Sequence, residues 1–393
     1  MERIELRKLV LATGCAVALD EFLFVRDPAL GDSEREKLAT LTSKKAQQLS
    51  DDAGWLCLPT GGTSGEMRFA RHDEHTVGAA VRGFCSHHGV ATVNALDVLP
   101  AHHVSGLMAR IRCAETGGQH VPWSWRQLEA GEWPVLPKND AGWFLSLVPT
   151  QLHRLLVNAE AAARLRDFRA VFIGGGPLWP ELAGMAAEAR VPVAICYGMT
   201  ETAAMIAAQT PEDFLHGDRS CGQPMIHAQV EILDENSGAI LPRGETGLVR
   251  IRGGSVFHGY WPGANSEQML VTEDLGRFDD RGRLIILGRR DAVIITGGKK
   301  VHPSEVEDAL RASGEFDDVA VVGMPDREWG SAVVACFPQR ARNLDRAKIE
   351  KALETLAPYK RPKRFVVVAP WPRNAQGKLN RQMLSEAALR QPL

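Results

Sequence analysis

The chain has 393 residues, of which 45% are hydrophobic and 24% are charged, and its formal net charge is -2 at pH 7. This length and composition predict a globular protein with a large core and two or three domains. With a net charge so close to zero, no overall electrostatic field favours nucleic acid or an anionic membrane. No apolar run approaches the ~18 residues of a membrane-spanning helix, and the charged N-terminus does not resemble a signal peptide.

Seven cysteines are scattered along the chain without a CxxC pair or a metal-binding spacing. An odd number of cysteines, several of them in apolar runs, is typical of free thiols in a reducing compartment. We therefore expect a cytoplasmic protein.

The start of the chain predicts helices before the first strand. Residues 1 to about 50 are charged and helical in pattern, with a helix expected at 33–49. A short strand at 55–58 then leads into a Gly/Thr/Ser turn at 60–65, and a helix is expected at 73–88.

From about 90 to 217 short apolar strands alternate with helices. The apolar runs at 170–173 and 191–196 both lead into glycine-bearing turns. Strands that end in such turns before helices predict an α/β unit with a mainly parallel sheet.

The character of the chain changes at about residue 218. Residues 227–233 and 247–252 alternate apolar and polar side chains between turns, which predicts an antiparallel β subdomain up to 288. Residues 1–288 are thus predicted to form a large N-terminal domain, and 289–393 a small mobile α+β C-terminal domain. The elements expected there are helices at 303–312 and 344–356 and strands at 318–323, 331–337 and 365–369.

The turn from Thr60 to Gly65 is the first segment that suggests chemistry. Its glycines let backbone N–H groups converge and its hydroxyls add donors, so the turn suits a phosphate. It is not a Walker A loop, because no Gly-Lys-Ser/Thr follows. The residues concerned are Thr60, Gly61, Gly62, Thr63, Ser64 and Gly65.

Three further segments lie in the α/β region. His102 and His103 precede Ser105 and Gly106, and a buried core pair of histidines is an equally good interpretation. The run Gly174-Gly175-Gly176 is a turn whose flat backbone would admit a planar ring. Tyr197 to Thr202 places an aromatic ring, a hydroxyl and a carboxylate just after a strand, where α/β sheets bind ligands.

Glu201 in that segment is a candidate Mg²⁺ ligand, since Mg²⁺ takes one or two carboxylates together with phosphate oxygens. Downstream, Asp274 and Arg289 could hold ribose hydroxyls, with an ordinary Asp-Gly turn as the alternative. Near the C-terminus, Lys378 lies on a Gly-bearing loop, where a lysine can act as a mobile positive point charge.

Together and in this order, the segments resemble the adenylate-forming superfamily of acyl-CoA synthetases, luciferases and peptide-synthetase adenylation domains. The resemblance runs from about Leu56 to Arg381 and is strongest at 197–201, 288–298 and 372–381. It implies a reaction in which a carboxylate attacks the α-phosphate of ATP, after which the C-terminal domain rotates and coenzyme A displaces AMP.

The resemblance also implies a role for each matching residue. The loop 60–65 would cradle the β- and γ-phosphates, Thr200 would contact the α-phosphate, and Glu201 with Thr63 would hold Mg²⁺. Lys378 would bridge the carboxylate and the α-phosphate. The adenosine would contact Gly174, Gly175, Gly176, Tyr197, Asp274 and Arg289. The hinge and the loop for the thiol step would be Asp291, Gly297, Gly298 and Lys299.

The chain departs from this family in three places, of which Glu273, where a Gly often precedes the Asp, is the smallest. The phosphate loop continues into Glu66 and Arg68 instead of the usual Pro-Lys, so the role of Arg68 stays open. Relatives carry roughly a hundred more residues before the loop, and a homodimer that covers an exposed face is one hypothesis that follows.

The segment from His103 to Leu107 resembles that of o-succinylbenzoate–CoA ligases of menaquinone and phylloquinone biosynthesis. Acid-binding residues would then be His103, Ser105, Gly106 and Gly198, with His103 also in a catalytic role. The alternatives are another aryl or medium-chain acyl-CoA ligase, or a non-catalytic relative that binds a nucleotide or an acyl-adenylate. The ligase reading predicts ATP, Mg²⁺ and coenzyme A as the cofactors and substrates beside the acid.

Overall fold

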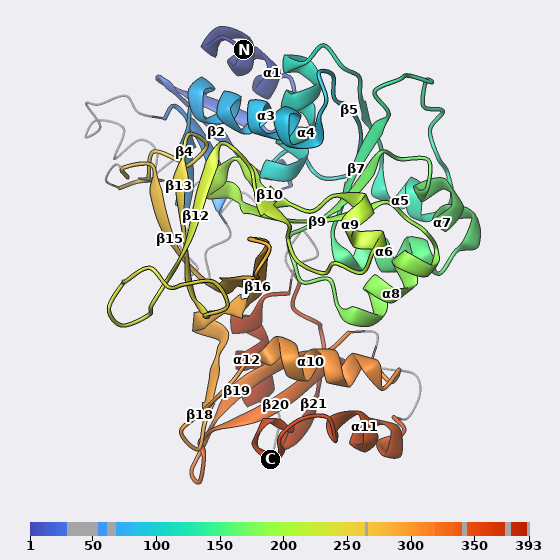
Figure 1. Ribbon diagram of the computed structural model, residues 1–393, viewed down its shortest axis with the longest axis vertical. Helices are drawn as coiled ribbons and strands as arrows, with labels where there is room; N and C mark the ends of the chain where they lie inside the picture. The colour runs from blue at the N-terminus through green and yellow to red at the C-terminus, as the bar shows by residue number, and fades with distance from the viewer. Residues whose placement is uncertain are drawn as a thin grey trace.

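A computed structural model describes residues 1–29, 54–60, 68–263, 266–316, 318–339, 344–373 and 379–390. Four sequence predictions lie outside these residues: the helix at 33–49, the loop from Gly61 to Gly65, Glu66, and Lys378. Figure 1 shows a large upper part, which contains the elements up to β16, and a smaller lower part, which contains β18 to α12.

A seven-stranded sheet lies at the centre of the larger part, with strand order β11-β10-β9-β8-β7-β5-β6. The strands from β5 to β9 pair in parallel, whereas β10 and β11 are antiparallel. Their bounds are β5 Asn94–Asp97, β6 His120–Pro122, β7 Trp143–Leu147, β8 Ala170–Ile173, β9 Val193–Met199, β10 Ala204–Ala208 and β11 Gln223–Pro224.

Helices cover both faces of this sheet, because its strands are apolar on both sides. Leu145 and Val171 pack on one face with the helices that follow β7 and β8. Their neighbours Phe144 and Phe172 pack on the other face, against Phe84. The helices are α3 Glu74–His88, α4 Val104–Glu115, α5 Trp125–Glu129, α6 Pro149–Leu156, α7 Ala159–Leu165, α8 Pro180–Glu188 and α9 Pro211–Leu215.

A five-stranded sheet, β1-β2-β3-β4-β14, lies beside the α3 and α4 side. It corrects one expectation, since residues 1 to about 50 are not helical throughout. After helix α1 Arg3–Leu11, residues 16–25 form an antiparallel hairpin. Phe24 and Leu23 are buried there, so tertiary packing explains these strands. The strands are β1 Ala16–Leu19, β2 Phe22–Val25, β3 Leu56–Thr60, β4 Arg68–His72 and β14 Tyr260–Trp261.

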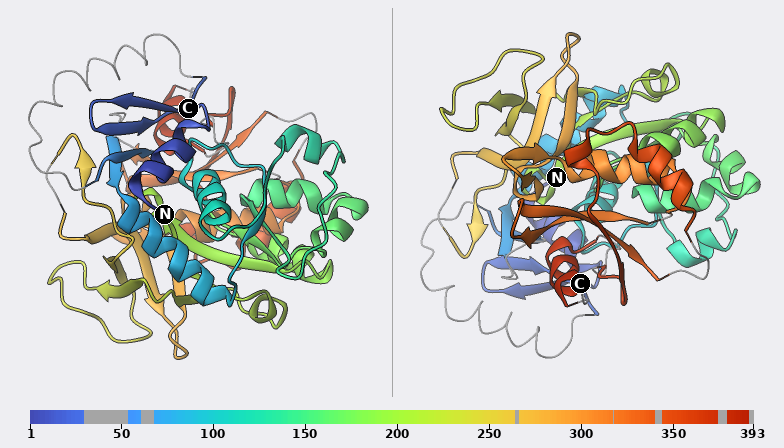
Figure 2. Two further views of the ribbon diagram at one scale, coloured as in Figure 1. Left: turned by 90° about the horizontal axis from the view of Figure 1, so that it is seen from above. Right: turned by 90° about the horizontal axis from the view of Figure 1, so that it is seen from below.

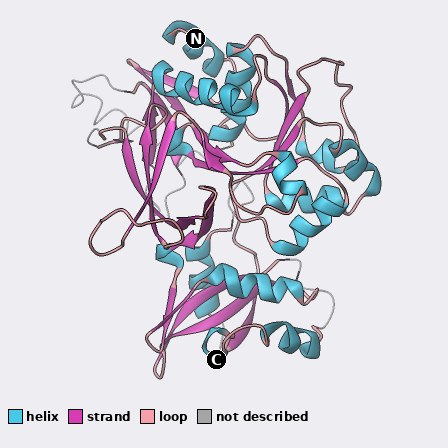
Figure 3. Cartoon of the chain, in the orientation of Figure 1, coloured by secondary structure: helices cyan, strands magenta, loops and turns pink. Residues whose placement is uncertain are grey.

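The predicted antiparallel β subdomain is a four-stranded sheet with order β12-β13-β15-β16. Figure 3 shows that strands dominate this side of the larger part and helices the other. The strands are β12 Ala228–Leu233, β13 Gly247–Gly253, β15 Met269–Phe278 and β16 Leu284–Arg289.

The smaller part contains a three-stranded sheet, β19-β20-β21, and a two-stranded hairpin. Helices α10 and α11 pack on one face and α12 on the other. In Figure 2 (right) this part lies in front of the larger one. Its elements are η3 Arg290–Ala292, β17 Ile294–Thr296, β18 Lys299–Val301, α10 Pro303–Ala312, β19 Ala320–Asp326, β20 Gly330–Pro338, α11 Arg346–Leu353, η4 Pro358–Lys360, β21 Arg364–Val368 and α12 Arg381–Leu389.

The two parts meet through polar contacts near the connecting segment. Lys300 Nζ lies 3.2 Å from Glu235 Oε1, and the Ser304 hydroxyl donates to the carbonyl of Leu287 at 3.1 Å. Farther along α10, the Arg311 guanidinium lies 5.3 Å from the Trp179 ring centroid. Within the described parts of the chain, no helix has the length and apolar character that crossing a bilayer requires.

Candidate active site

Several predicted site residues converge at the carboxyl ends of β8 and β9. The Gly174-Gly175-Gly176 turn follows β8 as expected. Tyr197 and Gly198 lie inside β9 instead of after it, because β9 continues to Met199 in antiparallel pairing with β10. The 3-10 turn η2 Thr200–Thr202 follows and carries Thr200 and Glu201.

Tyr197, Asp274 and Arg289 form one polar cluster. The buried Tyr197 hydroxyl donates to Asp274 Oδ2 at 2.7 Å, and Arg289 Nη1 lies 3.9 Å from Asp274 Oδ1. The last two residues face each other across β15 and β16, so the Asp-Gly turn considered for this segment is absent. Burial and the charge of Asp274 raise the pKa of Tyr197, so its phenol keeps its proton. The cluster offers a carboxylate and a guanidinium for sugar hydroxyls.

Arg289 also contacts the predicted hinge. It donates to both oxygens of Asp291, at 2.8 and 2.6 Å. The next residue, Arg290, makes a similar two-point pair with Glu273 at 2.8 and 2.7 Å. Planar guanidinium–carboxylate pairs of this kind define orientation as well as charge. They link the connecting segment to strand β15.

Glu201 has partners that the sequence did not suggest. The Tyr260 hydroxyl donates to Glu201 Oε1 at 2.8 Å. The ring of the buried His72 lies beside the same turn, where its Nε2–H donates to the Thr200 carbonyl at 2.8 Å. Burial lowers the pKa of His72 to about 4, so the ring is neutral. Neither residue belongs to a motif with a recognisable spacing, and only the fold brings them to η2.

The phosphate-loop prediction falls mostly outside the described residues, which include Thr60 at its start and resume at Arg68, after its end. Thr60 pairs with Arg68 at the ends of β3 and β4, and its hydroxyl donates to the Arg68 carbonyl at 3.3 Å. The Arg68 guanidinium lies 5.9 Å from the centroid of the Tyr260 ring. The base of the loop is therefore next to Glu201.

The protein's own packing or backbone conformation already requires glycine at several positions of the site. A Cβ on Gly198 would lie 2.0 Å from the Ala204 carbonyl oxygen, and one on Gly106 would lie 2.5 Å from that of Pro100. A Cβ on Gly174 would meet the Cys196 sulfur at 2.9 Å, and Gly175 has a φ of 76°. Because packing accounts for these glycines, their contacts with a ligand stay predictions.

His103 is the N-cap residue of α4, directly before Ser105 and Gly106. Its ring packs edge-on against His102, with centroids 4.2 Å apart, and His102 Nε2 lies 3.6 Å from Asp27 Oδ2. Burial and the neighbouring His102 lower the pKa of His103 to about 4. His103 is thus uncharged at neutral pH and can donate to a keto or carboxyl oxygen without offering a positive charge.

Arg112, two turns farther along α4, was not predicted. It is 4% exposed, its Nε and Nη2 have no hydrogen-bond partner in the described chain, and its guanidinium lies 4.4 Å from the Phe84 ring centroid. Burial lowers its pKa to about 10, which still leaves it charged at neutral pH. It borders a cavity of about 10 Å³, room for about one water molecule. The cavity lies under the central sheet, near Ser146 and Asp97.

The predicted thiol-step loop is the turn of the β17–β18 hairpin. Gly297 and Gly298 have φ values of 52° and 75°, which explains two glycines in succession. The Lys299 ammonium lies 4.6 Å from the centroid of the Tyr359 ring, within the smaller part. In the same part, Arg373 and Leu379 form an isolated β-bridge.

The side chains near Glu201 suit Mg²⁺ better than a metal that needs several protein ligands. Among the described residues no group of three or more His, Cys, Asp or Glu side chains could hold a metal ion. A single carboxylate such as Glu201 is what Mg²⁺ uses when substrate phosphates supply other ligands.

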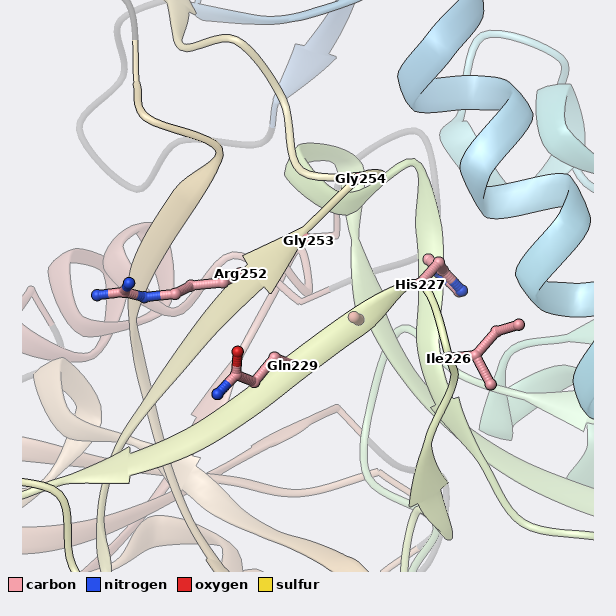
Figure 4. A pocket seen from close by; sticks show the side chains of 7 residues that line it. Ile226, His227, Gln229, Arg252, Gly253 and Gly254 are labelled. Carbon is pink, nitrogen blue, oxygen red and sulfur yellow. The ribbon is translucent and has the colours of Figure 1, made fainter.

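A separate surface hollow of about 340 Å³ lies on the β subdomain. Figure 4 shows that Gln229 and Arg252 extend from neighbouring strands there, away from His227. None of the residues lining it belongs to the clusters described above, so we do not assign it to the site.

Two family models match the chain. One, described as AMP-binding enzyme, matches residues 6–261, and one described as AMP-binding enzyme C-terminal domain matches residues 305–378. The chain is 31% identical over 344 residues to a 2-succinylbenzoate–CoA ligase of Oceanobacillus iheyensis, which covers 82% of this chain and 68% of the relative. It is 34% identical over 298 residues to the Geobacillus kaustophilus ligase of the same name, covering 74% and 60%.

The chain is also similar to solved structures of such enzymes. An o-succinylbenzoate CoA synthetase from Bacillus subtilis, in complex with its acyl-adenylate intermediate, superposes with a TM-score of 0.76 at 27% identity over 91% of this chain and 77% of that one. The same protein with ATP and a magnesium ion gives 0.72 at 26% identity, over 91% and 78%. An amide bond synthetase from Marinactinospora thermotolerans gives 0.70 at 28% identity, over 84% and 69%.

Proposed function

The chain belongs to the AMP-binding enzyme family, and we propose from this premise that it is an AMP-forming acid–CoA ligase. It would convert a carboxylic acid and ATP into an acyl-adenylate and pyrophosphate, then transfer the acyl group to coenzyme A. We propose o-succinylbenzoate as the acid, as in the relatives of that name.

The observation that supports ATP binding is that two clusters of polar residues meet at the end of β9. Tyr197, Asp274 and Arg289 would hold the ribose beside the Gly174–Gly176 turn. Glu201 lies next to the base of the loop predicted to bind the β- and γ-phosphates. A single bound ATP could contact both clusters.

Glu201, with Thr63 from the loop, is proposed to hold Mg²⁺, which would offset charge on the phosphate oxygens. Thr200 is proposed to contact the α-phosphate. Its main chain is held by the buried ring of His72, so the turn is rigid before the nucleotide arrives.

The two steps require different partners from the smaller domain. Lys378 is proposed to bridge the two anions that must meet in the first step. Rotation about Asp291 is then proposed to replace it with the Gly297-Gly298-Lys299 turn for the thiol step, because one pocket cannot hold both at once.

Arg112 favours an acid with a second carboxylate. A buried guanidinium with two unpartnered nitrogens costs free energy unless an anion approaches it. The adjacent cavity has room for about one water, through which the second carboxylate would reach Arg112. The uncharged His103, with Ser105, would then donate to the keto oxygen.

Pyrophosphate release with ATP and Mg²⁺ tests this proposal. The acids would be o-succinylbenzoate, benzoate, a coumarate and octanoate, each with and without coenzyme A. Turnover that requires coenzyme A with o-succinylbenzoate alone supports both parts of the proposal. Turnover on another acid keeps the reaction and overturns the substrate. ATP binding without turnover on any acid would support a non-catalytic nucleotide-binding protein.

We also propose a homodimer. The exposed apolar side chains Ile4 and Leu11 of α1 provide a surface that a second copy could cover. Light scattering after gel filtration at micromolar concentration should give twice the mass of 43.0 kDa, and a clean monomer would overturn the dimer.

A further inference from the structure

Tyr260 and its neighbours hold Glu201 from two sides. The Tyr260 hydroxyl lies 2.8 Å from Glu201 Oε1, and the Phe257 backbone N–H donates to the Glu201 carbonyl at 2.8 Å. The two aromatic rings pack edge-on with centroids 4.8 Å apart. One short segment therefore fixes both the main chain and the carboxylate of Glu201.

The same tyrosine is attached to the base of the phosphate loop. Its strand β14 pairs with β4, where Tyr260 faces Ala70. Arg68, the first residue of β4, lies with its guanidinium 5.9 Å from the Tyr260 ring centroid. Tyr260 thus contacts both Arg68 and Glu201.

The hydrogen bond leaves one carboxylate oxygen of Glu201 for a ligand. The Tyr260 phenol is the donor, because an ionised carboxylate can only accept a hydrogen bond. Oε1 accepts this bond, and no protein donor to Oε2 is found among the described residues. A carboxylate oriented in this way is ready to bind a divalent ion through a single oxygen.

We propose that Tyr260 is a positioning residue for the divalent ion bound with ATP, acting through Glu201. This inference rests on the proposed function, because it assigns Glu201 to the ion. It separates the two tyrosines of the site: the half-buried Tyr260 serves the ion, whereas the buried Tyr197 serves the ribose through Asp274.

The test is the substitution Tyr260→Phe, which removes the hydroxyl and keeps the ring against Phe257 and Arg68. Mn²⁺ binding to the protein–ATP complex would be measured by electron paramagnetic resonance, and AMP binding by calorimetry. Loss of a group that orients a metal ligand typically weakens metal binding by about tenfold or more. We expect about tenfold weaker Mn²⁺ binding and unchanged AMP affinity.

Tyr197→Phe is the matched control, because it removes the other tyrosine hydroxyl that donates to a carboxylate of the site. It should show the reverse pattern, with weaker AMP binding and unchanged Mn²⁺ affinity of the ATP complex. A second check uses Glu201→Gln. If Tyr260 acts through Glu201, adding Tyr260→Phe to that variant should not weaken Mn²⁺ binding further.

Unchanged Mn²⁺ affinity in Tyr260→Phe would overturn the inference, as would equal losses of Mn²⁺ and AMP binding. Additive losses in the double variant would also overturn it, since the tyrosine would then act independently of Glu201. If the unmodified protein bound no Mn²⁺ with ATP, the proposed function itself would fail, which distinguishes the two ideas.

Discussion

Arg112 is a charged residue that the fold buries between α3, α4 and the central sheet. Its Nε and Nη2 lack partners in the described chain. Sequence reasoning did not select it, because one arginine in an amphipathic helix normally lies on the solvated face. This buried, unpartnered positive charge favours a substrate acid with a second carboxylate.

We predict that Arg112→Met raises the KM for o-succinylbenzoate by about tenfold, the value of one hydrogen bond to a charged group. The KM for ATP should stay unchanged. Removing a buried unpaired cation should not lower the melting temperature. Steady-state kinetics and a thermal melt check both outcomes, and a large loss of stability would mean that Arg112 is structural.

Lys378 lies outside the described residues, and its role rests on the family motif. Lys378→Ala should reduce acid-dependent pyrophosphate release by at least about a hundredfold, since the lysine stabilises charge in the adenylation step. Thioester formation from preformed acyl-adenylate should persist. An unchanged rate of pyrophosphate release would remove Lys378 from the mechanism.

At the scale of elements, helix α3 directly follows strand β4, which pairs with β3. Asp73 caps its N-terminus by accepting from the backbone N–H groups of His75 and Thr76, at 3.0 and 2.8 Å. The His258 ring also donates to Asp73, at 2.9 Å, from the segment that leads to Tyr260. The cap therefore joins α3 to β14 as well as starting the helix.

Asp73→Ala should lower the free energy of unfolding by about 1–2 kcal/mol at pH 7, the usual range for a lost N-cap. Burial alone would raise the pKa of Asp73, but hydrogen bonds from His258 and Thr76 outweigh it and lower that pKa. A lowered folded-state pKa stabilises the fold above the unfolded value of about 4, and this contribution is lost as the pH falls.

The difference between wild type and Asp73→Ala should therefore shrink below pH 4, which thermal melts at pH 7 and pH 3 would detect. Asp345→Ala is a suitable control, because Asp345 caps α11 through Ala347 and Lys348. It should destabilise the protein without affecting the contact with His258. A pH-independent effect of Asp73→Ala would contradict the assigned hydrogen bonds.

For the whole molecule, the charged residues Asp308 and Arg311 of α10 lie close to helix α8 of the larger part and its flank. Asp308 forms an ion pair with Arg311 at 3.1 Å, yet its pKa is raised to about 6 by burial, which outweighs Arg311, with Glu307 and Glu181 adding to the rise. Glu181 belongs to α8 of the larger part. The described arrangement thus binds a proton at Asp308 more tightly than the unfolded chain does.

A raised carboxyl pKa stabilises the fold at low pH, and this contribution is lost as the pH rises through about 6. Asp308→Asn, which is always uncharged, should therefore gain melting temperature relative to wild type as the pH rises from 4 to 7.5. Glu160→Gln, which alters an exposed ion pair with Arg164 on α7 alone, is the control. A constant difference across this range would show that Asp308 has no such role.

The sequence by itself determined the family, the α/β class and the ligase class, and the comparisons confirm them. It could do so because these depend on local patterns: apolar strands ending in glycine turns, and short motifs whose order is preserved. Tyr197, Glu201, Asp274 and Arg289 were predicted from such motifs, and the fold gathers them near one strand end, although their roles stay predictions.

Only the tertiary structure decided which residues support that site. His72, Tyr260 and Arg112 have no motif, and each is brought into place by strand pairing or helix packing between segments distant in sequence. The hairpin at 16–25 was missed for the same reason, since its burial depends on its pairing with β3. Hydrogen bonds and charges that act through space between distant segments leave no periodic trace in the chain.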